Sequence, residues 1–365
     1  MTGENVSRET SSAVSRSVAR AIDELRRGAP VRIASPGGDL TIVAVELADD
    51  ATLATLETGG RAGLILAHPR AALLNIVNQR AAAAGDAVWI DRAPWMDLLA
   101  SVAVADPVRD LATPFKGPFT SRDPGPLADA GNAAVRLAKL AGLLPAVFAG
   151  HGAPDALPVA AAAVLAYAPH TDLRLVTRAR LPLTGAENTQ VVAFRAADGG
   201  PEHLALLIGD PAQSQPVLTR LHSACLTGDL LGSLKCDCGP QLRGAIATIA
   251  GAGGGILLYL QQEGRGIGLI NKLRAYALQD QGFDTVDANL RLGFDADERD
   301  FALAAAMLRQ LGVARVRLLT NNPDKVAGLE AGGIAVVERV AHAMPANPHN
   351  AVYLDTKRAR QGHLL

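Results

Sequence analysis

All three cysteines of this 365-residue chain lie within one short stretch: Cys225, Cys236 and Cys238. Three thiolates can bind Zn²⁺ at about 2.3 Å each and leave the fourth tetrahedral position to water, as catalytic zinc sites do. His222, three residues before Cys225, is the nearest candidate for a further ligand. The stretch therefore predicts a metal site that could activate water.

Two other uses of these cysteines compete with a metal site. They could be small buried apolar residues or free thiols. They could also form one disulfide and leave one thiol over, but Cys236 and Cys238 are too close in sequence for an ordinary bridge. Nothing in the composition indicates an oxidising compartment. Because the chain has no other cysteine, their concentration favours a metal.

Two glycine- or asparagine-containing stretches could bind the phosphates of a substrate. Glu263–Gly268 follows a buried strand and precedes a helix; its glycines let the backbone approach a phosphate, and Arg265 could bind paired oxygens. Thr320–Lys325 lies at a similar junction, and Lys325 supplies a point charge. Glycine turns before helices are common, so the first stretch alone is weak evidence, and turn and cap chemistry would explain the second equally well.

Two further clusters carry groups that could transfer protons or stabilise charge. Tyr276 lies in a predicted helix, where a packed aromatic is the simpler interpretation. Asp297–Asp300 opens another helix; acidic residues are ordinary there, but Arg299 opposes the helix dipole and so suggests another role. Together with the cysteines, these clusters predict metal-activated water acting on a phosphorylated substrate such as a nucleotide.

Composition excludes several classes of protein. Lys and Arg number 35 and Asp and Glu 36, so the net charge of −1 gives no general attraction to nucleic acid or membranes. A zinc-ribbon nucleic-acid binder also needs more than three cysteines. The polar N-terminus lacks the apolar region of a signal peptide, and Ala156–Pro169 is too short to span a bilayer. We expect a cytoplasmic protein with no nucleic-acid or membrane partner.

The elements that must position these residues fall into two halves. Residues 1–10 are expected to be disordered and 103–127 rich in loops. The first half is predicted to contain helices at 11–28, 50–58 and 132–143, a helix ending in the alanines 81–84, and strands at 31–35, 39–47 and 61–67. A Gly-, Pro- and Ala-rich linker is predicted at 151–171.

The second half begins with strands and then alternates. Strands are predicted at 189–195, 203–210, 215–222, 255–260, 313–320 and 334–340, and helices at 241–252, 271–281, 300–311 and 324–331. The tail 341–365 is expected to be irregular. This order predicts a mixed α/β, or α+β, fold in two domains.

Residues 172–365 closely resemble GTP cyclohydrolase II, the first enzyme of riboflavin synthesis. Four ordered runs carry the resemblance: HSACLTGDLLGSLKCDCGPQL, QQEGRGIGLINKLRAYALQDQGFDTVDAN, LGFDADERDF and LLTNNPDKV. The resemblance implies that the three cysteines hold one zinc ion per subunit. Water activated by that metal would attack C8 of the guanine ring of GTP and release formate.

The resemblance also implies roles for other residues. Tyr276 matches a tyrosine needed for ring opening, and Asp297 an acid or base. Arg299 matches an arginine proposed as nucleophile on the α-phosphate, with diphosphate leaving; because guanidinium stays protonated, a purely electrostatic role competes. Mg²⁺ would bind the phosphates, and a homodimer is expected. The implied GTP contacts are Arg220, Leu221, His222, Ser223, Ala224, Gln241, Glu263, Gly264, Arg265, Thr285, Thr320 and Lys325.

Residues 11–150 resemble a degenerate 3,4-dihydroxy-2-butanone 4-phosphate synthase, the usual fusion partner. The runs AIDELRRGAPVRIA, GRAGLILA and AAVRLAKLAGLLPA match its scaffold. Its acidic run is replaced by Ser35–Leu40, its Gly-His-Thr-Glu signature by Asp129–Asn132, and a later glutamate by His151 or a neighbour. We therefore expect no synthase activity; this half could hold a dimer together or modulate the cyclohydrolase.

Two other functions remain open. Ala224 stands where the cyclohydrolase family usually has glutamate, which places substrate fit in question but not zinc binding. The chain could therefore be a GTP-binding regulatory protein without turnover. It could also be a cyclohydrolase that opens the ring but omits a later hydrolysis.

Overall fold

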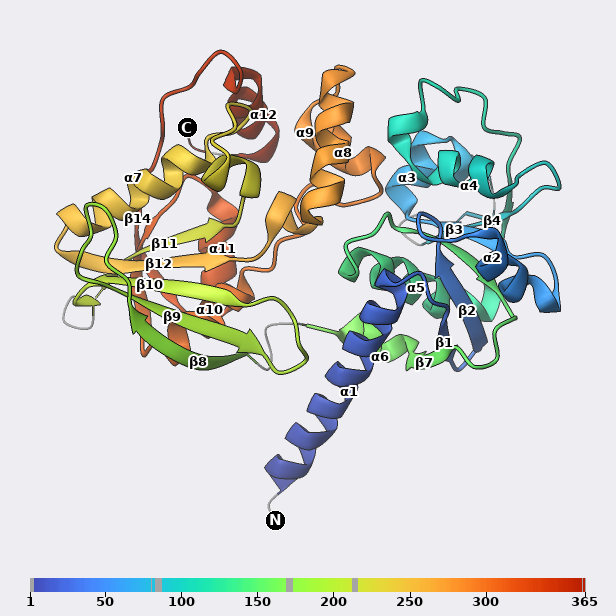
Figure 1. The fold of residues 1–365 in the computed structure, drawn as a ribbon, viewed down its shortest axis with the longest axis horizontal. Helices are drawn as coiled ribbons and strands as arrows, with labels where there is room; N and C mark the ends of the chain where they lie inside the picture. The colour runs from blue at the N-terminus through green and yellow to red at the C-terminus, as the bar shows by residue number, and fades with distance from the viewer. Residues whose placement is uncertain are drawn as a thin grey trace. The chain divides into compact units, whose positions relative to one another are not determined.

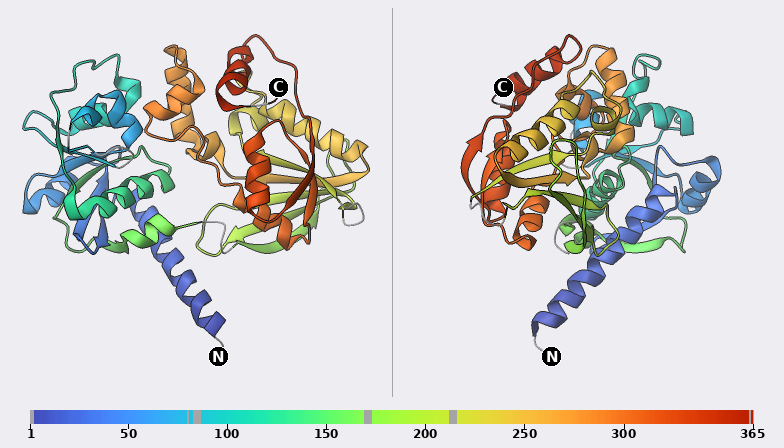
Figure 2. Two further views of the ribbon diagram at one scale, coloured as in Figure 1. Left: turned by 180° about the vertical axis from the view of Figure 1, so that it is seen from behind. Right: turned by 60° about the vertical axis from the view of Figure 1, so that its left-hand side comes forward.

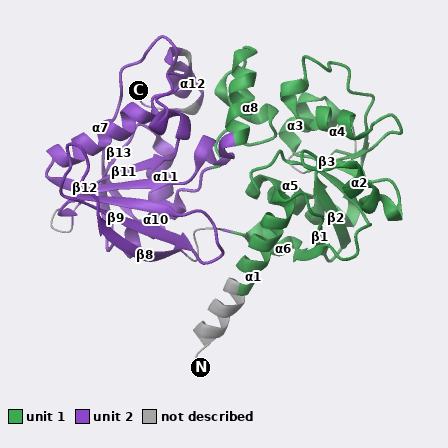
Figure 3. Cartoon of the chain, viewed as in Figure 1, with its two compact units in different colours: residues 1–167, 270–298 green, residues 168–269, 299–365 purple. Residues whose placement is uncertain are grey.

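The computed structural model describes residues 3–79, 81–82, 87–168, 173–211, 216–362 and 364. The chain divides into two compact units (Figure 3). Unit 1 comprises residues 1–167 and 270–298, and unit 2 comprises residues 168–269 and 299–365. The boundary after Tyr167 falls inside the predicted linker, whereas residues 270–298 join unit 1. The domain limits predicted from the sequence, 11–150 and 172–365, stay a prediction.

Unit 1 is built on a seven-stranded sheet of order β5-β4-β3-β6-β2-β1-β7, in which only β1 and β7 pair in parallel. Helix α5 packs on the strands in the middle of this sheet, with α1 beside it. Apolar residues of both helices and of the sheet form one core, including Leu25, Ile33 and Val147. The strands are β1 (Val31–Ser35), β2 (Gly38–Ala44), β3 (Gly63–Leu66), β4 (Val88–Asp91), β5 (Thr120–Arg122), β6 (Ala146–Gly150) and β7 (Leu157–Ala160).

The helices of unit 1 come from two separate parts of the chain. Those before residue 167 are α1 (Gly3–Arg26), α2 (Asp50–Leu56), α3 (His68–Leu73), α4 (Leu98–Ala105), α5 (Ala128–Leu140) and α6 (Ala161–Ala166). Helix α8 (Gly268–Asp280), from Ile270 onward, and helix α9 (Thr285–Arg291) belong to residues 270–298. Helix α9 contacts α3, so the later segment is part of the packing of unit 1.

Unit 2 contains a second seven-stranded sheet, of order β14-β13-β11-β12-β10-β9-β8. Its first four strands in this order pair in parallel, and β12, β10, β9 and β8 pair antiparallel. The strands are β8 (Leu173–Arg180), β9 (Thr189–Ala196), β10 (His203–Gly209), β11 (Val217–Ser223), β12 (Gly254–Leu260), β13 (Arg315–Leu319) and β14 (Ala335–Val340).

Helices cover both faces of this sheet (Figures 1 and 2). Helix α7 (Cys238–Gly251) contributes Ala245 and Ile249 to the core on one face. Helices α10 (Ala302–Gln310) and α11 (Pro323–Ala331) supply Met307 and Leu329 to the core on the other. Because β11 and β12 are parallel, Ser223 and Leu260 end at the same edge of the sheet, where ligands of α/β folds usually bind. The last helix is α12 (Ala351–Gln361).

The mixed α/β class is confirmed, and several local expectations are corrected. Helix α1 begins at Gly3, so the stretch expected to be disordered is helical from there on. Helix α3 ends at Leu73, well before the alanines; alanine favours a helix, but short helices need tertiary packing. Of those alanines, residues 83 and 84 lie outside the described residues.

Three segments expected to be irregular contain regular structure. The loop-rich region 103–127 includes the end of α4 and strand β5. The predicted linker contains β7 and α6, and its residues 169–171 lie outside the described part of the chain. The tail holds α12, whose buried face includes Thr356 and Lys357, so its hydropathy pattern did not reveal a helix. Within the described ranges, no helix combines the length and apolar character needed to cross a membrane.

Candidate metal centre and nucleotide site

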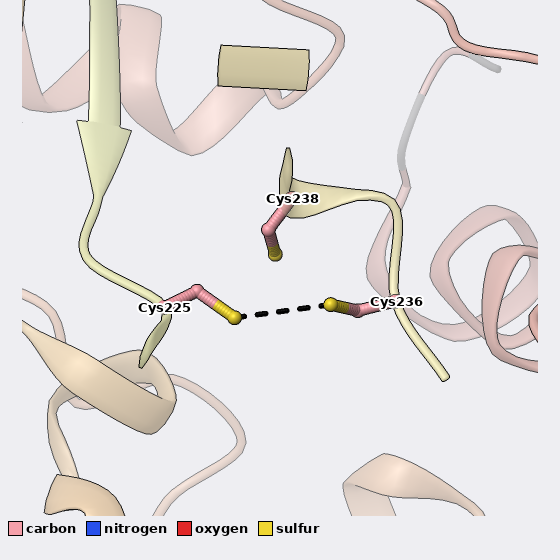
Figure 4. Close-up of side chains that lie close together, drawn as sticks. All are labelled: Cys225, Cys236 and Cys238. Atoms are coloured by element: carbon pink, nitrogen blue, oxygen red, sulfur yellow. Dashed lines mark hydrogen bonds between the residues drawn. The ribbon is translucent and has the colours of Figure 1, made fainter. Parts of the chain in front are cut away.

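The three cysteines meet at one point of unit 2. Their sulfur atoms all lie within 4.8 Å of one another, and the Sγ atoms of Cys225 and Cys236 are 3.8 Å apart (Figure 4). Cys225 follows strand β11, and Cys238 begins helix α7. Among the described residues this is the one group of three or more potential ligands that could hold a metal. The end of β11 and the start of α7 thus bring Cys225 next to Cys236, which lies eleven residues later in sequence, and to Cys238.

The cluster fits a zinc ion in spacing and in donor type. Ligands about 2.3 Å from a tetrahedral zinc lie about 3.8 Å from one another, which the Cys225–Cys236 pair matches. Disulfide sulfurs would lie about 2.0 Å apart, and none of the three cysteines forms a disulfide. Gly228 closes the site: a Cβ there would lie 2.6 Å from the sulfur of Cys236, so only glycine fits.

Crowding of the thiols opposes their ionisation. The hydrogen bond from Cys225 and the burial of the side chain raise the pKa of Cys236 to about 11. The neighbouring thiols and burial also raise the pKa of Cys238 well above its ordinary value. A divalent cation would offset this cost, because metal-bound cysteines are thiolates. The Gly228 N–H already points at the Cys225 sulfur, at 3.3 Å.

Asp229 holds the cysteine loop, the turn η7 (Leu226–Leu230), against the sheet. Its carboxylate accepts hydrogen bonds from the Cys225 N–H (3.0 Å) and the Tyr259 hydroxyl (2.9 Å). His222 Nε2 lies 3.0 Å from the same carboxylate, and its ring stacks on Tyr259. Burial lowers the pKa of His222, so the neutral ring donates from Nε2 to Asp229. The group of potential metal ligands in the structure consists of the three cysteines and does not include His222.

Asp237, between the two later cysteines, is almost completely buried, with 2% of its surface exposed. Gln241 and the ammonium of Lys357 donate to its two oxygens, the latter at 2.9 Å. Gln241 in turn accepts from Arg220, whose other terminal nitrogen donates to the Leu319 carbonyl. A continuous chain of hydrogen bonds therefore joins Lys357 to Arg220. Burial lowers the pKa of Arg220 to about 10, which leaves it a cation at neutral pH.

The glycine-rich turn η8 (Glu263–Gly266) contacts the cysteine loop directly. Glu263 accepts a hydrogen bond of 2.7 Å from the N–H of Leu226, the residue after Cys225. Gly264 and Arg265 both have left-handed backbones, with φ near 62° and 63°. This conformation is costly for arginine and concentrates at functional sites. Both terminal nitrogens of Arg265 are buried without a hydrogen-bond partner among the described residues, so its guanidinium is available to an anion.

Arg299 and Lys325 both lie near the ring of Phe301. The guanidinium carbon of Arg299 lies 5.1 Å from the ring centroid and the Lys325 ammonium 6.0 Å from it. Lys325 also donates to the Leu221 carbonyl at 2.7 Å, so it lies beside strand β11. Thr320 uses its hydroxyl to accept from the Asn322 N–H in the turn before α11. The anion-binding residues predicted at this second junction are thus buried and ordered.

The remaining predicted residues divide between the units. Leu221, Ser223 and Ala224 lie at the end of β11, and the buried Ala224 N–H donates to Leu260 O at 2.8 Å. Tyr276, Thr285 and Asp297 belong to unit 1. The Lys272 ammonium lies 5.7 Å from the Tyr276 ring, and Gln279 donates to the Thr285 hydroxyl. The structure therefore brings together the predicted residues of unit 2.

Sequence reasoning missed Asp229, Asp237, Tyr353 and Lys357. Asp229 and Asp237 stand inside the recognised motif, so their position next to the cysteines was a usable signal. Tyr353 and Lys357 stand in the tail, more than a hundred residues from the cysteines. No local pattern marks them, and only the packing of α12 brings them to the site.

A three-cysteine cluster that could hold a metal, with buried cations in the same unit, at the carboxyl ends of parallel strands, is typical of metal-dependent enzymes that act on anionic substrates. Residues 174–341 match the GTP cyclohydrolase II family. A protein from Azospirillum brasilense named GTP cyclohydrolase-2 is 49% identical over 372 residues, covering 97% of this chain and 95% of the relative. The chain therefore belongs to the GTP cyclohydrolase II family, as the sequence predicted.

Shorter relatives match the second half alone. A GTP cyclohydrolase-2 from Cronobacter sakazakii is 58% identical over 193 residues, covering 53% of this chain and 98% of the relative. Among solved structures, a two-domain 3,4-dihydroxy-2-butanone 4-phosphate synthase from A. baumannii aligns with 90% of this chain and 99% of its own. Its sequence identity of 19% and TM-score of 0.30 are too low to support a conclusion.

Proposed function

We propose that this chain hydrolyses GTP to the phosphoribosylated diaminopyrimidinone, formate and diphosphate, the first step of riboflavin synthesis. The observation that carries the proposal is the cluster of Cys225, Cys236 and Cys238, which fits zinc in spacing and donor type. Full-length similarity to a GTP cyclohydrolase-2 supports the same reaction. When bound, zinc would supply Lewis-acid activation of water in this site.

The protein's own cations would bind the triphosphate. Arg265, with two unpartnered terminal nitrogens, is the strongest candidate for a phosphate contact. Arg299 and Lys325, which both lie near the Phe301 ring, would neutralise further charge. Mg²⁺ on the phosphates would share this task. The ring contact favours a cationic Arg299, and so supports an electrostatic role over a nucleophilic one.

Two further groups would handle protons and orientation. We assign Tyr276 to orienting water or the opened ring, and Asp297 to acid or base assistance of phosphate cleavage. Arg220, His222, Ser223, Gln241, Glu263, Thr285 and Thr320 are proposed to shape the nucleotide site. His222 Nδ1 and Ser223 Oγ are buried without a hydrogen-bond partner in the part of the chain that the structure describes, which supports a polar ligand beside them.

The test is incubation of the purified zinc-loaded protein with GTP and Mg²⁺. We expect stoichiometric formate and diphosphate, and a product mass equal to the diaminopyrimidinone phosphoribosylamine. A formylated product would indicate ring opening without the later hydrolysis. Absence of formate and of any altered nucleotide would overturn the proposal.

A GTP-binding protein without turnover is the second candidate. Ala224 favours it, because this buried residue stands beside Cys225 where the family usually has glutamate. Saturable GTP binding by calorimetry, with no product after prolonged incubation, would identify this function. Ala224→Glu should then restore turnover if the missing carboxylate is the cause.

We also propose that the first half has no synthase activity. Its support is that Ser35–Leu40 and Asp129–Asn132 stand where the synthase family has its acidic run and its Gly-His-Thr-Glu signature, since that reaction needs Mg²⁺ held by carboxylates. Ribulose 5-phosphate should remain unchanged on incubation with the protein and Mg²⁺.

We also propose that the protein is a homodimer in the cytoplasm. Light scattering after gel filtration tests the dimer.

A further inference from the structure

Helix α12 lies beyond residues 174–341, the part of the chain that matches the family, yet its inner face reaches the metal centre. We infer that Lys357 is a positioning residue of that centre. Through Asp237 it holds the turn that carries Cys236 and Cys238, so the C-terminal helix becomes part of the zinc site. The inference rests on the proposed function, because it assumes that the cysteines bind a functional metal.

The contact between Lys357 and Asp237 is buried on both sides. Lys357 Nζ lies 2.9 Å from Asp237 Oδ1, and the two residues keep 8% and 2% of their surface exposed. Asp237 has a cysteine of the cluster on either side in sequence. Any shift of its carboxylate therefore moves the backbone that places both sulfurs. Residues that orient metal ligands in this way are usually worth 10- to 100-fold in metal affinity or activity.

Charge gives a second reason for a cation at this position. Three thiolates on Zn²⁺ leave a net charge of about −1, and ionised Asp237 adds another beside it. Removing one partner of a buried ion pair leaves an uncompensated charge, which is strongly unfavourable. Without Lys357, Asp237 would keep Gln241 as its one side-chain donor among the described residues and would repel the neighbouring thiolates. Lys357 thus offsets the negative charge of Asp237 and of the metal-bound thiolates.

The same helix also contacts the glycine-rich turn. The Lys357 ammonium lies 4.3 Å from the centroid of the Tyr353 ring, one helical turn earlier. The guanidinium carbon of Arg265 lies 5.9 Å from that same centroid. After α12, the Leu364 N–H donates to Asn321 O at 2.9 Å. Helix α12 therefore contacts the turn that carries Cys236 and Cys238 and the glycine-rich turn η8. Leu364, after the helix, is bound to Asn321, which follows β13, and all these residues belong to unit 2.

The test compares Lys357→Met, which removes the charge but keeps much of the side chain's bulk, with Lys357→Arg, which restores a cation. Arg358→Met is the matched control, since Arg358 is adjacent in α12 but exposed, and it pairs with the exposed Asp355 three residues earlier in the same helix. Each full-length variant is loaded with zinc, and transfer of zinc to a metallochromic chelator is timed. The Co²⁺-substituted proteins are compared by their thiolate-to-metal absorption.

We expect Lys357→Met to release zinc about 10- to 100-fold faster and to shift the Co²⁺ spectrum. Lys357→Arg should recover most of the effect, and Arg358→Met should behave as the wild type. In the double variant with Asp237→Asn, the two effects should not add, because both remove the same ion pair. Wild-type zinc release and an unchanged Co²⁺ spectrum in Lys357→Met would overturn the inference.

A measurement on the unaltered protein keeps the inference testable if Lys357→Met does not fold. Coupling between zinc binding and the packing of α12 is reciprocal. If a change in α12 weakens zinc binding, removal of zinc should destabilise α12. Hydrogen exchange in residues 351–361 should increase when zinc is chelated, and unchanged exchange there would overturn the inference. Failure of the proposed function looks different: the wild type would release no formate, whereas the zinc and exchange results would stand.

Discussion

Lys139 of helix α5 forms an ion pair with Glu298, with 2.6 Å between Nζ and Oε1. The same ammonium lies 3.3 Å from Asp295 and 5.9 Å from the centroid of the Phe294 ring. One cation from the first half of the chain therefore holds the end of the 270–298 segment, immediately before Arg299. Arg274 does the same earlier in that segment, pairing with Glu46 at 2.7 Å. Residues of the first half thus have a structural task in unit 1, where they hold the 270–298 segment.

Lys139→Met should lower turnover of GTP without releasing zinc. The substitution removes the contacts that order residues 294–298, and with them the proposed acid or base Asp297. Half-buried ion pairs in a small network contribute about 1 kcal/mol, so kcat should fall roughly twofold to tenfold. Steady-state kinetics and zinc content measure this. Arg27→Met, which removes an exposed cation of unit 1, is the control; equal kinetics in the two variants would contradict the prediction.

Cys236→Ser should abolish both metal binding and turnover. A hydroxyl is a poor replacement for a thiolate, and two sulfurs cannot complete the site. Zinc content should fall from about one per chain to near zero, and formate release by at least about 100-fold. Lys235→Met, an exposed neighbour, serves as the control. Stoichiometric zinc in Cys236→Ser would mean that the ligands are assigned wrongly.

Arg265→Gly should separate stability from substrate binding. Glycine adopts the left-handed conformation freely, whereas arginine there costs about 1–2 kcal/mol, so the melting temperature should be unchanged or higher. The loss of charged hydrogen bonds to phosphate should raise KM for GTP roughly tenfold or more. Thermal unfolding measures the melting temperature, and steady-state kinetics measure KM for GTP. A less stable variant with an unchanged KM would show that Arg265 serves only the fold.

His203 should make the fold sensitive to mild acid. Burial lowers its pKa to about 4, and Nδ1 accepts the Gln261 N–H. The unfolded chain, with a histidine pKa near 6.5, therefore binds the proton first, so stability falls as pH drops from about 6.5 toward 4. This residue alone should cost about 2 kcal/mol between pH 7 and pH 5.

The variant His203→Asn isolates that effect. Asparagine keeps a hydrogen-bond acceptor but does not titrate, so its loss of stability over this range should be smaller by about the same amount. Denaturant unfolding of the zinc-saturated proteins at both pH values gives the comparison. Parallel pH profiles for the two proteins would show that His203 does not cause the acid sensitivity.

The elements that could be predicted from the sequence are those with a local cause. The buried strand β12 and helix α11, with its Asn322 cap, follow from periodicity and capping residues. Helix α12 could not be recognised in this way, because Thr356 and Lys357 occupy its buried face. Burial of polar side chains depends on distant partners, here Asp237, which no local window contains.

The sequence by itself determined the family and marked the three cysteines as a candidate metal site, because thiol side chains at close spacing are typical of thiolate metal sites. The tertiary structure alone decided how the cluster is supported. Asp229 binds the loop to β12, and Lys357 reaches Asp237 from the end of the chain. These contacts join residues distant in sequence, and only the packing of helices on a finished sheet brings such residues within hydrogen-bonding distance.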